Sequence, residues 1–177
     1  LSASNSAFTG EGKLRVFGTL WANLCMFVGY DIYLGPTSEA EIRGGTIMEY
    51  EWAGIHVDGS APVIADNLIF SSGALYGILV EGENAAPSIV SNIIALSQFG
   101  IYARGTDMGG VYDNLIVLNS DAGILAEDAT GKIHDNILLA NKVEILLRNS
   151  DVSVEDNEIG YTNLFQVLAN YAPLLGH

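Results

Sequence analysis

Residues 100–138 have the sequence GIYARGTDMGGVYDNLIVLNSDAGILAEDATGKIHDNIL, and this stretch decides the fold because it contains one pattern twice. Ile101 recurs 23 residues later as Ile124, and Asn114 recurs 22 residues later as Asn136. A unit of this length cannot bury its apolar face alone, so a repeat of this period is typical of solenoids, in which successive units stack.

The pattern extends in both directions and forms four apolar columns with the same period. The column of Ile101 consists of Ile32, Ile55, Ile78, Ile101, Ile124 and Ile145. Two residues further on lie Leu34, Val57, Val80, Ala103, Ala126 and Leu147. The others are Ile42, Ile64, Ile89, Val111, Ile133 and Val154, and Ile47, Ile69, Ile94, Ile116, Leu138 and Ile159. Each unit therefore predicts three short strands, and stacking at about 4.8 Å places the columns in one core.

Asparagine recurs just before the third strand of each unit. These residues are Asn67, Asn92, Asn114, Asn136 and Asn157, with Gly45 in the equivalent place one unit earlier. Asparagine tolerates the left-handed backbone of a tight turn, and stacked amides can form hydrogen bonds from unit to unit. We therefore expect an internal asparagine ladder.

The motif Ile-x-x-Asn-x-Ile, as in residues 133–138, followed by a Gly-Ile strand such as Gly100-Ile101, resembles the right-handed β-helix repeats of the pectate lyase-like superfamily. The resemblance implies an all-β, single-domain right-handed parallel β-helix of about seven coils of three strands over residues 13–170. We expect residues 1–12 to form an N-terminal cap and residues 171–177 a C-terminal tail or cap. The superfamily includes lyases, hydrolases, epimerases, phage adhesins and surface proteins, so it implies no single activity. The catalytic motifs of its enzymes have no match here, and no catalytic residue is carried over.

The composition excludes several classes of function. The 21 acidic and 7 basic side chains give a formal charge of −14, which repels nucleic-acid phosphates, so we expect no nucleic-acid partner. The single cysteine, Cys25, excludes an internal disulfide. No apolar run approaches the roughly 20 residues that span a bilayer, so we expect no membrane insertion.

Outward positions of the first strand carry candidate functional side chains. Tyr33, His56 and Tyr102 are suited to contact a sugar ring. The next column places Asp58 beside Glu81, about 5 Å apart, with Arg104 on the following rung. Such a trio could share Ca²⁺ or provide the chemistry of a lyase or hydrolase. Alternating acid and base in one column is equally typical of ion pairing on a solvated sheet, so the catalytic hypothesis stays open.

A second acidic column lies directly before the asparagines and contains Asp113, Asp135 and Asp156. Stacked carboxylates repel one another unless a cation neutralises them, and Ca²⁺ prefers oxygen ligands. Aspartate is also an ordinary turn residue. Calcium is therefore one hypothesis for this column, and a purely conformational role is the other.

The third strand is apolar at its outward positions as well as its inward ones. The outward residues are Leu68, Ile93, Leu115 and Ile137. Strands with two apolar faces are usually covered on both. A second copy of the chain, a docked domain or the terminal segments of the chain could provide the cover.

Together these features favour a non-catalytic β-helix scaffold or binding module of an extracellular or cell-surface protein, which binds polysaccharide and forms homo-oligomers. The first alternative is a polysaccharide lyase or glycoside hydrolase that acts along the first-strand face. The second is a fibre domain of a phage or cell envelope. No cofactor other than calcium is suggested.

Overall fold

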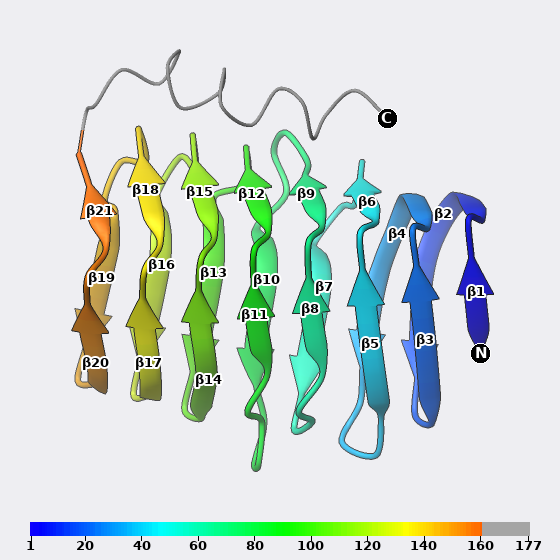
Figure 1. Ribbon diagram of the computed structural model, residues 1–177, viewed down its shortest axis with the longest axis horizontal. Coiled ribbons are helices and arrows are strands. Elements are labelled where there is room, and N and C mark those ends of the chain that lie inside the picture. The colour runs from blue at the N-terminus through cyan, green and yellow to red at the C-terminus, as the bar shows by residue number, and fades with distance from the viewer. Residues whose placement is uncertain (161–177) are drawn as a thin grey trace.

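The computed structural model describes residues 1–160, which form a parallel β-solenoid whose rungs lie side by side along its long axis (Figure 1). An eight-stranded sheet consists of β1 (Ser2–Ser4), β3 (Thr19–Asn23), β5 (Glu39–Arg43), β8 (Val63–Ala65), β11 (Ser88–Val90), β14 (Asp107–Tyr112), β17 (Thr130–His134) and β20 (Asp151–Glu155). From β5 onward, these strands are the predicted second strands of the repeat, whereas β1 and β3 extend the sheet beyond the predicted column.

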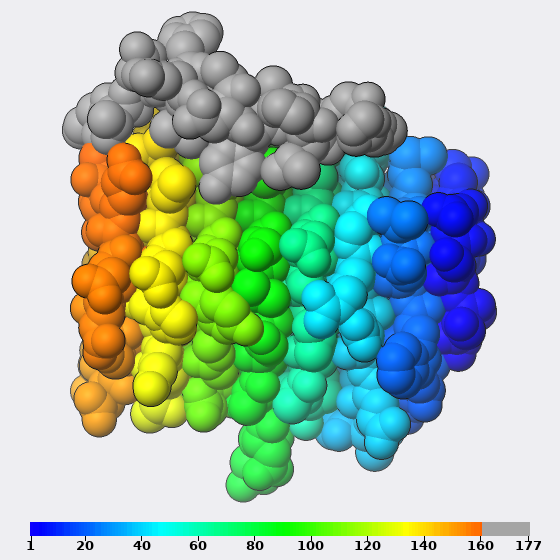
Figure 2. Space-filling model, viewed as in Figure 1, coloured from blue at the N-terminus to red at the C-terminus, as the bar shows by residue number. Residues whose placement is uncertain are grey.

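A 13-stranded sheet contains the other two strands of each repeat as two arms. The strand-three arm consists of β6 (Thr46–Met48), β9 (Leu68–Phe70), β12 (Ile93–Ala95), β15 (Leu115–Val117), β18 (Ile137–Leu139) and β21 (Glu158–Ile159). The strand-one arm consists of β7 (Ala53–Asp58), β10 (Tyr76–Glu81), β13 (Phe99–Arg104), β16 (Ala122–Glu127) and β19 (Ile145–Arg148). In Figure 2 each rung is a band of one colour, so residues far apart in sequence share one face.

The predicted apolar columns pair in register. Ile101 lies between Ile78 and Ile124, and Ile94 lies between Ile69 and Ile116. All of these isoleucines are completely buried in one core that runs through the rungs. Each buried isoleucine stabilises the fold by about 1.5–3 kcal/mol, because its apolar surface is removed from water. The core therefore repeats along the solenoid with the period of the sequence.

The asparagine ladder is confirmed. The backbone N–H and the side-chain Nδ2 of Asn92 both donate to Oδ1 of Asn114, at 2.9 and 3.0 Å. Nδ2 also donates to the carbonyl oxygen of Ile64, at 2.9 Å. The backbone N–H of Gly45, which has no side chain to offer, donates to Oδ1 of Asn67 at the start of the ladder. Buried amides thus satisfy the turn backbone of the neighbouring rung.

A second polar stack lies at the turn between strands three and one, and the sequence analysis did not identify it. The N–H of Ser97 donates to Oδ1 of Asn119 at 3.1 Å, and Asn119 Nδ2 donates to Asn141 Oδ1 at 2.8 Å. The hydroxyls of Tyr50 and Ser97 are 2.9 Å apart and share a hydrogen bond. The 22-residue spacing of Asn119 and Asn141 was the available signal.

The first two rungs depart from the three-strand pattern. Strands three and one merge there into the long strands β2 (Ala7–Val16) and β4 (Met26–Leu34), which pair with each other and join the two arms at β4. A glycine bend replaces the usual turn, because Gly29 has φ +80° and a Cβ there would lie 1.8 Å from the carbonyl oxygen of Gly10. A side chain cannot fit between two backbones this close.

The predicted boundaries of the cap, the β-helix and the tail lie only partly within the described residues. Residues 1–12 were predicted as a cap, and the structure gives them β1 and the first half of β2, which continue the sheets as the outermost rung. The predicted tail, residues 171–177, and the end of the predicted β-helix, residues 161–170, lie outside the described residues. Residues 1–160 include no helix long and apolar enough to cross a membrane.

Candidate functional site

The outer side of the strand-one arm, here called the strand-one face, carries a continuous row of rings. Its members are Phe17, Tyr33, His56, Trp52, Tyr76, Phe99 and Tyr102, here called the aromatic stripe. Successive ring centroids are 5.0 to 5.9 Å apart, from Tyr33–His56 to Tyr76–Phe99. Strand pairing sets this spacing, because Tyr76 lies opposite Phe99 and Tyr33 opposite His56 in adjacent strands.

The aromatic stripe covers the aliphatic residues of the same face. Leu79 and Leu125 point away from the main core but are buried in a separate cluster with Tyr102, Tyr76 and Phe99. Tyr33, Trp52, Tyr76 and Phe99 pack on the sheet through one side and remain half-exposed through the other, whereas His56 and Tyr102 are buried. An apolar surface of this kind is fixed in shape before any ligand arrives.

Carboxylates at the rim of the strand-one face hold two of the tyrosines. Tyr33 donates from its hydroxyl to Asp58 Oδ2, and Tyr102 donates to Glu127 Oε2, both at 2.6 Å. The hydrogen bond to Asp58 raises the pKa of Tyr33, and burial, together with the bond to Glu127, raises the pKa of Tyr102 to about 12. Both hydroxyls are thereby kept protonated and fixed in direction.

Glu81 connects the stripe to the charged rim. Its Oε1 accepts from His56 Nε2 at 3.0 Å, and its Oε2 accepts from Arg104 Nη2 at 2.6 Å. Burial lowers the pKa of His56, although Glu81 acts in the opposite direction. Asp58 and Glu81 pair across adjacent strands, as predicted. The predicted catalytic trio therefore lies together, but Glu81 already has a partner at each oxygen.

A family model for the right-handed β-helix region matches residues 30–170. The chain is a member of the right-handed β-helix family. None of the curated proteins compared with it matches. Membership agrees with the predicted resemblance and with the parallel solenoid described above, and it sets the fold without setting an activity.

The predicted ligand-binding residues of this β-helix protein occupy one column. Tyr33, His56 and Tyr102 all lie on the strand-one face, but His56 and Tyr102 are only 7% and 8% exposed. The half-exposed rings Trp52 and Tyr76 beside them were missed. Tyr76 and Phe99 are 23 residues apart, the period of the isoleucines, so their alignment was visible in the sequence.

The acidic column before the asparagines is a row of left-handed turn residues. Asp113, Asp135 and Asp156 have φ of 57°, 55° and 50°, and Gly44 has the equivalent conformation in an earlier rung. Aspartate is one of the few side chains that tolerates this backbone, which accounts for the column without a cation. Among residues 1–160 no three His, Cys, Asp or Glu side chains are grouped to hold a metal ion. Calcium stays a prediction.

The outer side of the strand-three arm, here called the strand-three face, is aliphatic. Leu68, Ile93, Leu115 and Ile137 pair in one column, as predicted. Leu115 is completely buried, together with Val117 and Leu139, while the other three members of the column are half-buried. Any contact with a partner would therefore be made by Leu68, Ile93 and Ile137 rather than by Leu115.

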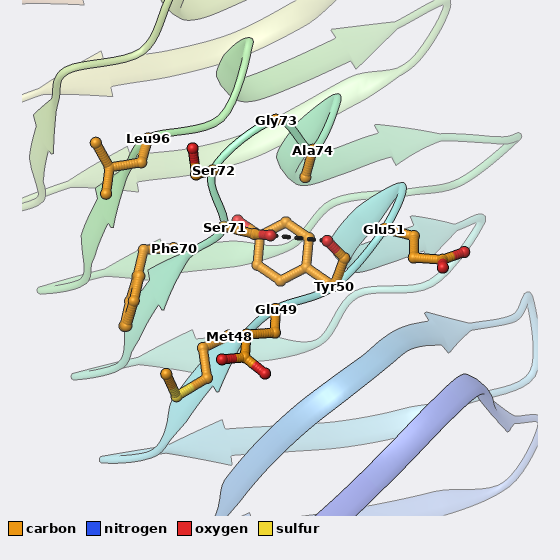
Figure 3. Close-up of a pocket in the computed structure, with 10 residues that line it drawn as sticks. All are labelled: Met48, Glu49, Tyr50, Glu51, Phe70, Ser71, Ser72, Gly73, Ala74 and Leu96. Carbon is orange, nitrogen blue, oxygen red and sulfur yellow. Dashed lines mark hydrogen bonds between the residues drawn. The ribbon is translucent and has the colours of Figure 1, made fainter.

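A hollow of about 630 Å³ lies where strand three turns into strand one. Figure 3 shows Met48, Phe70 and Leu96 on one side of Tyr50 and Glu51 on the other. Apolar walls with acidic neighbours favour an apolar ligand that carries positive charge. The hollow shares no lining residue with the aromatic stripe.

Proposed function

We propose that this β-helix protein is a non-catalytic scaffold that binds glycans along the strand-one face, outside the cell or at its surface. The observation that carries the proposal is the aromatic stripe, which spans five rungs with ring centroids no more than 5.9 Å apart. One face of a sugar ring presents C–H groups, and such a face packs on the large apolar surface of an aromatic ring. Sugar hydroxyls can meanwhile donate to the carboxylates at the rim.

The geometry of the solenoid fits a chain molecule. Rungs are separated by about 4.8 Å, and one pyranose unit lengthens an extended glycan by a similar distance. A glycan that runs along the solenoid axis would therefore meet a new rung with each sugar. Because the rings are already packed against Leu79 and Leu125, binding requires little ordering of side chains.

The test is a glycan array with labelled protein, with and without calcium, followed by titration of the best oligosaccharide. Replacing Trp52 with Ala removes the ring at the centre of the stripe and should lower affinity about tenfold. Trp21→Ala is the matched control, because Trp21 is exposed on the eight-stranded sheet, away from the stripe. Absence of glycan binding, or equal losses in both variants, would contradict the proposal.

An enzyme acting along the same face is the second candidate. The observation in its favour is the hydrogen-bonded network in which Glu81 joins His56 to Arg104, beside Asp58. A polysaccharide lyase or glycoside hydrolase would release shortened products from the glycan identified on the array. Product formation that disappears in Asp58→Asn or Arg104→Ala would replace the scaffold proposal with this one.

We also propose that the strand-three face joins two copies of the chain. The half-buried Leu68, Ile93 and Ile137 are large aliphatic side chains in one column, which favours a contact between identical surfaces. Ile93→Glu should reduce the mass measured by light scattering to that of one chain while the circular dichroism spectrum stays unchanged. A native trimer would favour a fibre domain, and a wild-type monomer would end the self-association proposal.

A further inference from the structure

The N-terminal end of the aromatic stripe differs from the rest because it contains a hollow with two basic side chains. This hollow has a volume of about 290 Å³ and is lined by Lys13, Arg15, Phe17, Tyr33, Trp52 and His56. Lys13 and Arg15 are exposed and alternate with the half-buried Leu14 and the buried Val16 along β2, so both project from the strand-one face. The Lys13 Nζ atom lies 5.0 Å from the centroid of the Trp52 ring.

The surroundings of these two cations differ from those of four other basic side chains. Arg43, Arg104, Lys142 and Arg148 each have a carboxylate within ion-pair distance. In the part of the chain that the structure describes, neither Lys13 nor Arg15 has one. In a chain with a net charge of −14, two unpaired cations beside an aromatic wall form an unusual local site.

One nitrogen of the imidazole in the wall of the hollow, Nδ1 of His56, also lacks a partner among the described residues. His56 Nε2 donates to the carboxylate of Glu81, which leaves Nδ1 of the neutral ring as an acceptor. His56 is more than nine-tenths buried, and Nδ1 makes no hydrogen bond to the described residues. A buried acceptor without a partner is costly, so the side chain of His56, which lines the hollow, includes a polar atom that the described residues leave unsatisfied.

The charge of the rim changes from positive to negative at the edge of the hollow, where Asp58 accepts a hydrogen bond from Tyr33. Asp58, Glu81 and Glu127 lie along it, while Arg104 already pairs with Glu81 and Arg148 lies 3.9 Å from Glu127. An anionic sugar at these rungs would meet carboxylates and no free cation. A neutral sugar would meet aromatic surface and hydrogen-bond acceptors.

From this asymmetry we propose that the ligand is a glycan with a single acidic sugar, held in the hollow by Lys13 and Arg15, and with neutral sugars along the rest of the aromatic stripe. The inference rests on the proposed glycan binding and adds the charge pattern and the direction of the bound chain. Either a carboxylate or a sulfate on the acidic sugar would provide the anionic oxygen atoms that Lys13 and Arg15 bind.

The experiment compares oligosaccharides of one length and linkage by isothermal titration calorimetry. The probes are a neutral chain, a chain ending in one uronic acid, a chain ending in one sulfated sugar, and a chain of uronic acids throughout. The better singly acidic probe should bind about tenfold more tightly than the neutral chain, and the fully acidic chain should bind less tightly than that probe. Comparison of the uronic acid with the sulfate identifies the anionic group.

Two double variants test whether Lys13 and Arg15 cause the tighter binding of the singly acidic probe. The double variant Lys13→Gln/Arg15→Gln should bind the singly acidic probe no more tightly than the same variant binds the neutral chain. The double variant Lys132→Gln/Lys142→Gln changes net charge equally at distant positions and should have no effect. Equal affinity of wild type for the neutral and singly acidic probes would overturn this inference and leave glycan binding intact. Binding of none of the probes or array glycans would overturn both.

Discussion

The strand-one and strand-three faces are both apolar surfaces on the outside of the same sheet, yet they are built from different side chains. The strand-one face carries half-exposed rings whose edges reach charged partners, as Tyr33 reaches Asp58. The strand-three face carries branched aliphatic side chains around a completely buried Leu115. Aliphatic side chains have no hydrogen-bonding group, so they gain free energy only by leaving water.

This difference indicates two different tasks. Aromatic side chains with a polar end are suited to a surface that contacts water when free and a ligand when bound, because the hydroxyls of Tyr33 and Tyr102 keep their hydrogen bonds at the rim. A close-packed aliphatic surface stabilises the fold or an assembly and offers little specificity to a small polar ligand. Mutations in the two faces should therefore separate stability from binding.

The largest expected effect is the loss of stability in Leu115→Ala. Removing this side chain leaves a cavity among Val117, Leu139 and the neighbouring isoleucines, and should lower the free energy of unfolding by about 2–5 kcal/mol. Urea unfolding measures the change, and glycan affinity should stay as in wild type. A loss below about 1 kcal/mol would mean that the strand-three face is not packed, which would remove the contrast between the faces.

At high pH, Tyr102 on the strand-one face should make the stability of the protein depend on pH. The pKa of Tyr102 is raised from 10.0 to about 12, so between these values the folded protein retains a proton that the unfolded chain has lost. The stabilising contribution is complete below pH 10 and falls as the pH rises toward 12. Urea midpoints across this range should fall more steeply in wild type than in Tyr102→Phe. Parallel curves would show that Tyr102 titrates normally.

In mild acid the same face should respond through His56. Burial lowers its pKa below 6.5, so as the pH falls below 6.5 the unfolded chain binds a proton before the folded protein does, and stability decreases. An NMR titration should place the midpoint below 6.5. Glu81→Gln should lower it further, because Glu81 favours the charged imidazole. A midpoint above 6.5 in wild type would mean that the pairing with Glu81 outweighs burial.

Much of the fold was predictable because every rung must bury the same apolar columns and satisfy the same turn backbone. The isoleucine columns and the ladder of Asn67 to Asn157 follow from one period, and one period fixes the register. The second stack was harder to recognise, because Tyr50 and Ser97 occupy the positions that Asn119 and Asn141 fill later, and Ser71 donates to the carbonyl oxygen of Tyr50. Different side chains there satisfy the same backbone.

The candidate site was predicted less completely, for a geometric reason. The rim residues Asp58, Glu81 and Arg104 follow from alternation along a strand and were placed correctly beside one another. Trp52 lies just before β7, so alternation along that strand does not apply to it. Tyr76 is two residues before the inward-facing Ile78, so alternation would place it inward as well, yet it packs in the outer cluster. Alternation alone could not show that these two rings point outward, so the stripe emerged only in three dimensions.

The smallest expected effect concerns a leucine at the edge of the strand-three face. Leu118 has φ +59° and is 41% exposed, although this left-handed backbone favours asparagine, aspartate and glycine. Leu118→Asn should therefore raise the free energy of unfolding of one chain by about 0.5–1 kcal/mol in urea. If the strand-three face joins two copies, the same variant should also shift sedimentation toward the single chain, because it removes an exposed apolar group at the rim of the contact. Stabilisation without any change in association would place the contact elsewhere, and a loss of stability would mean that the leucine packs within its own chain.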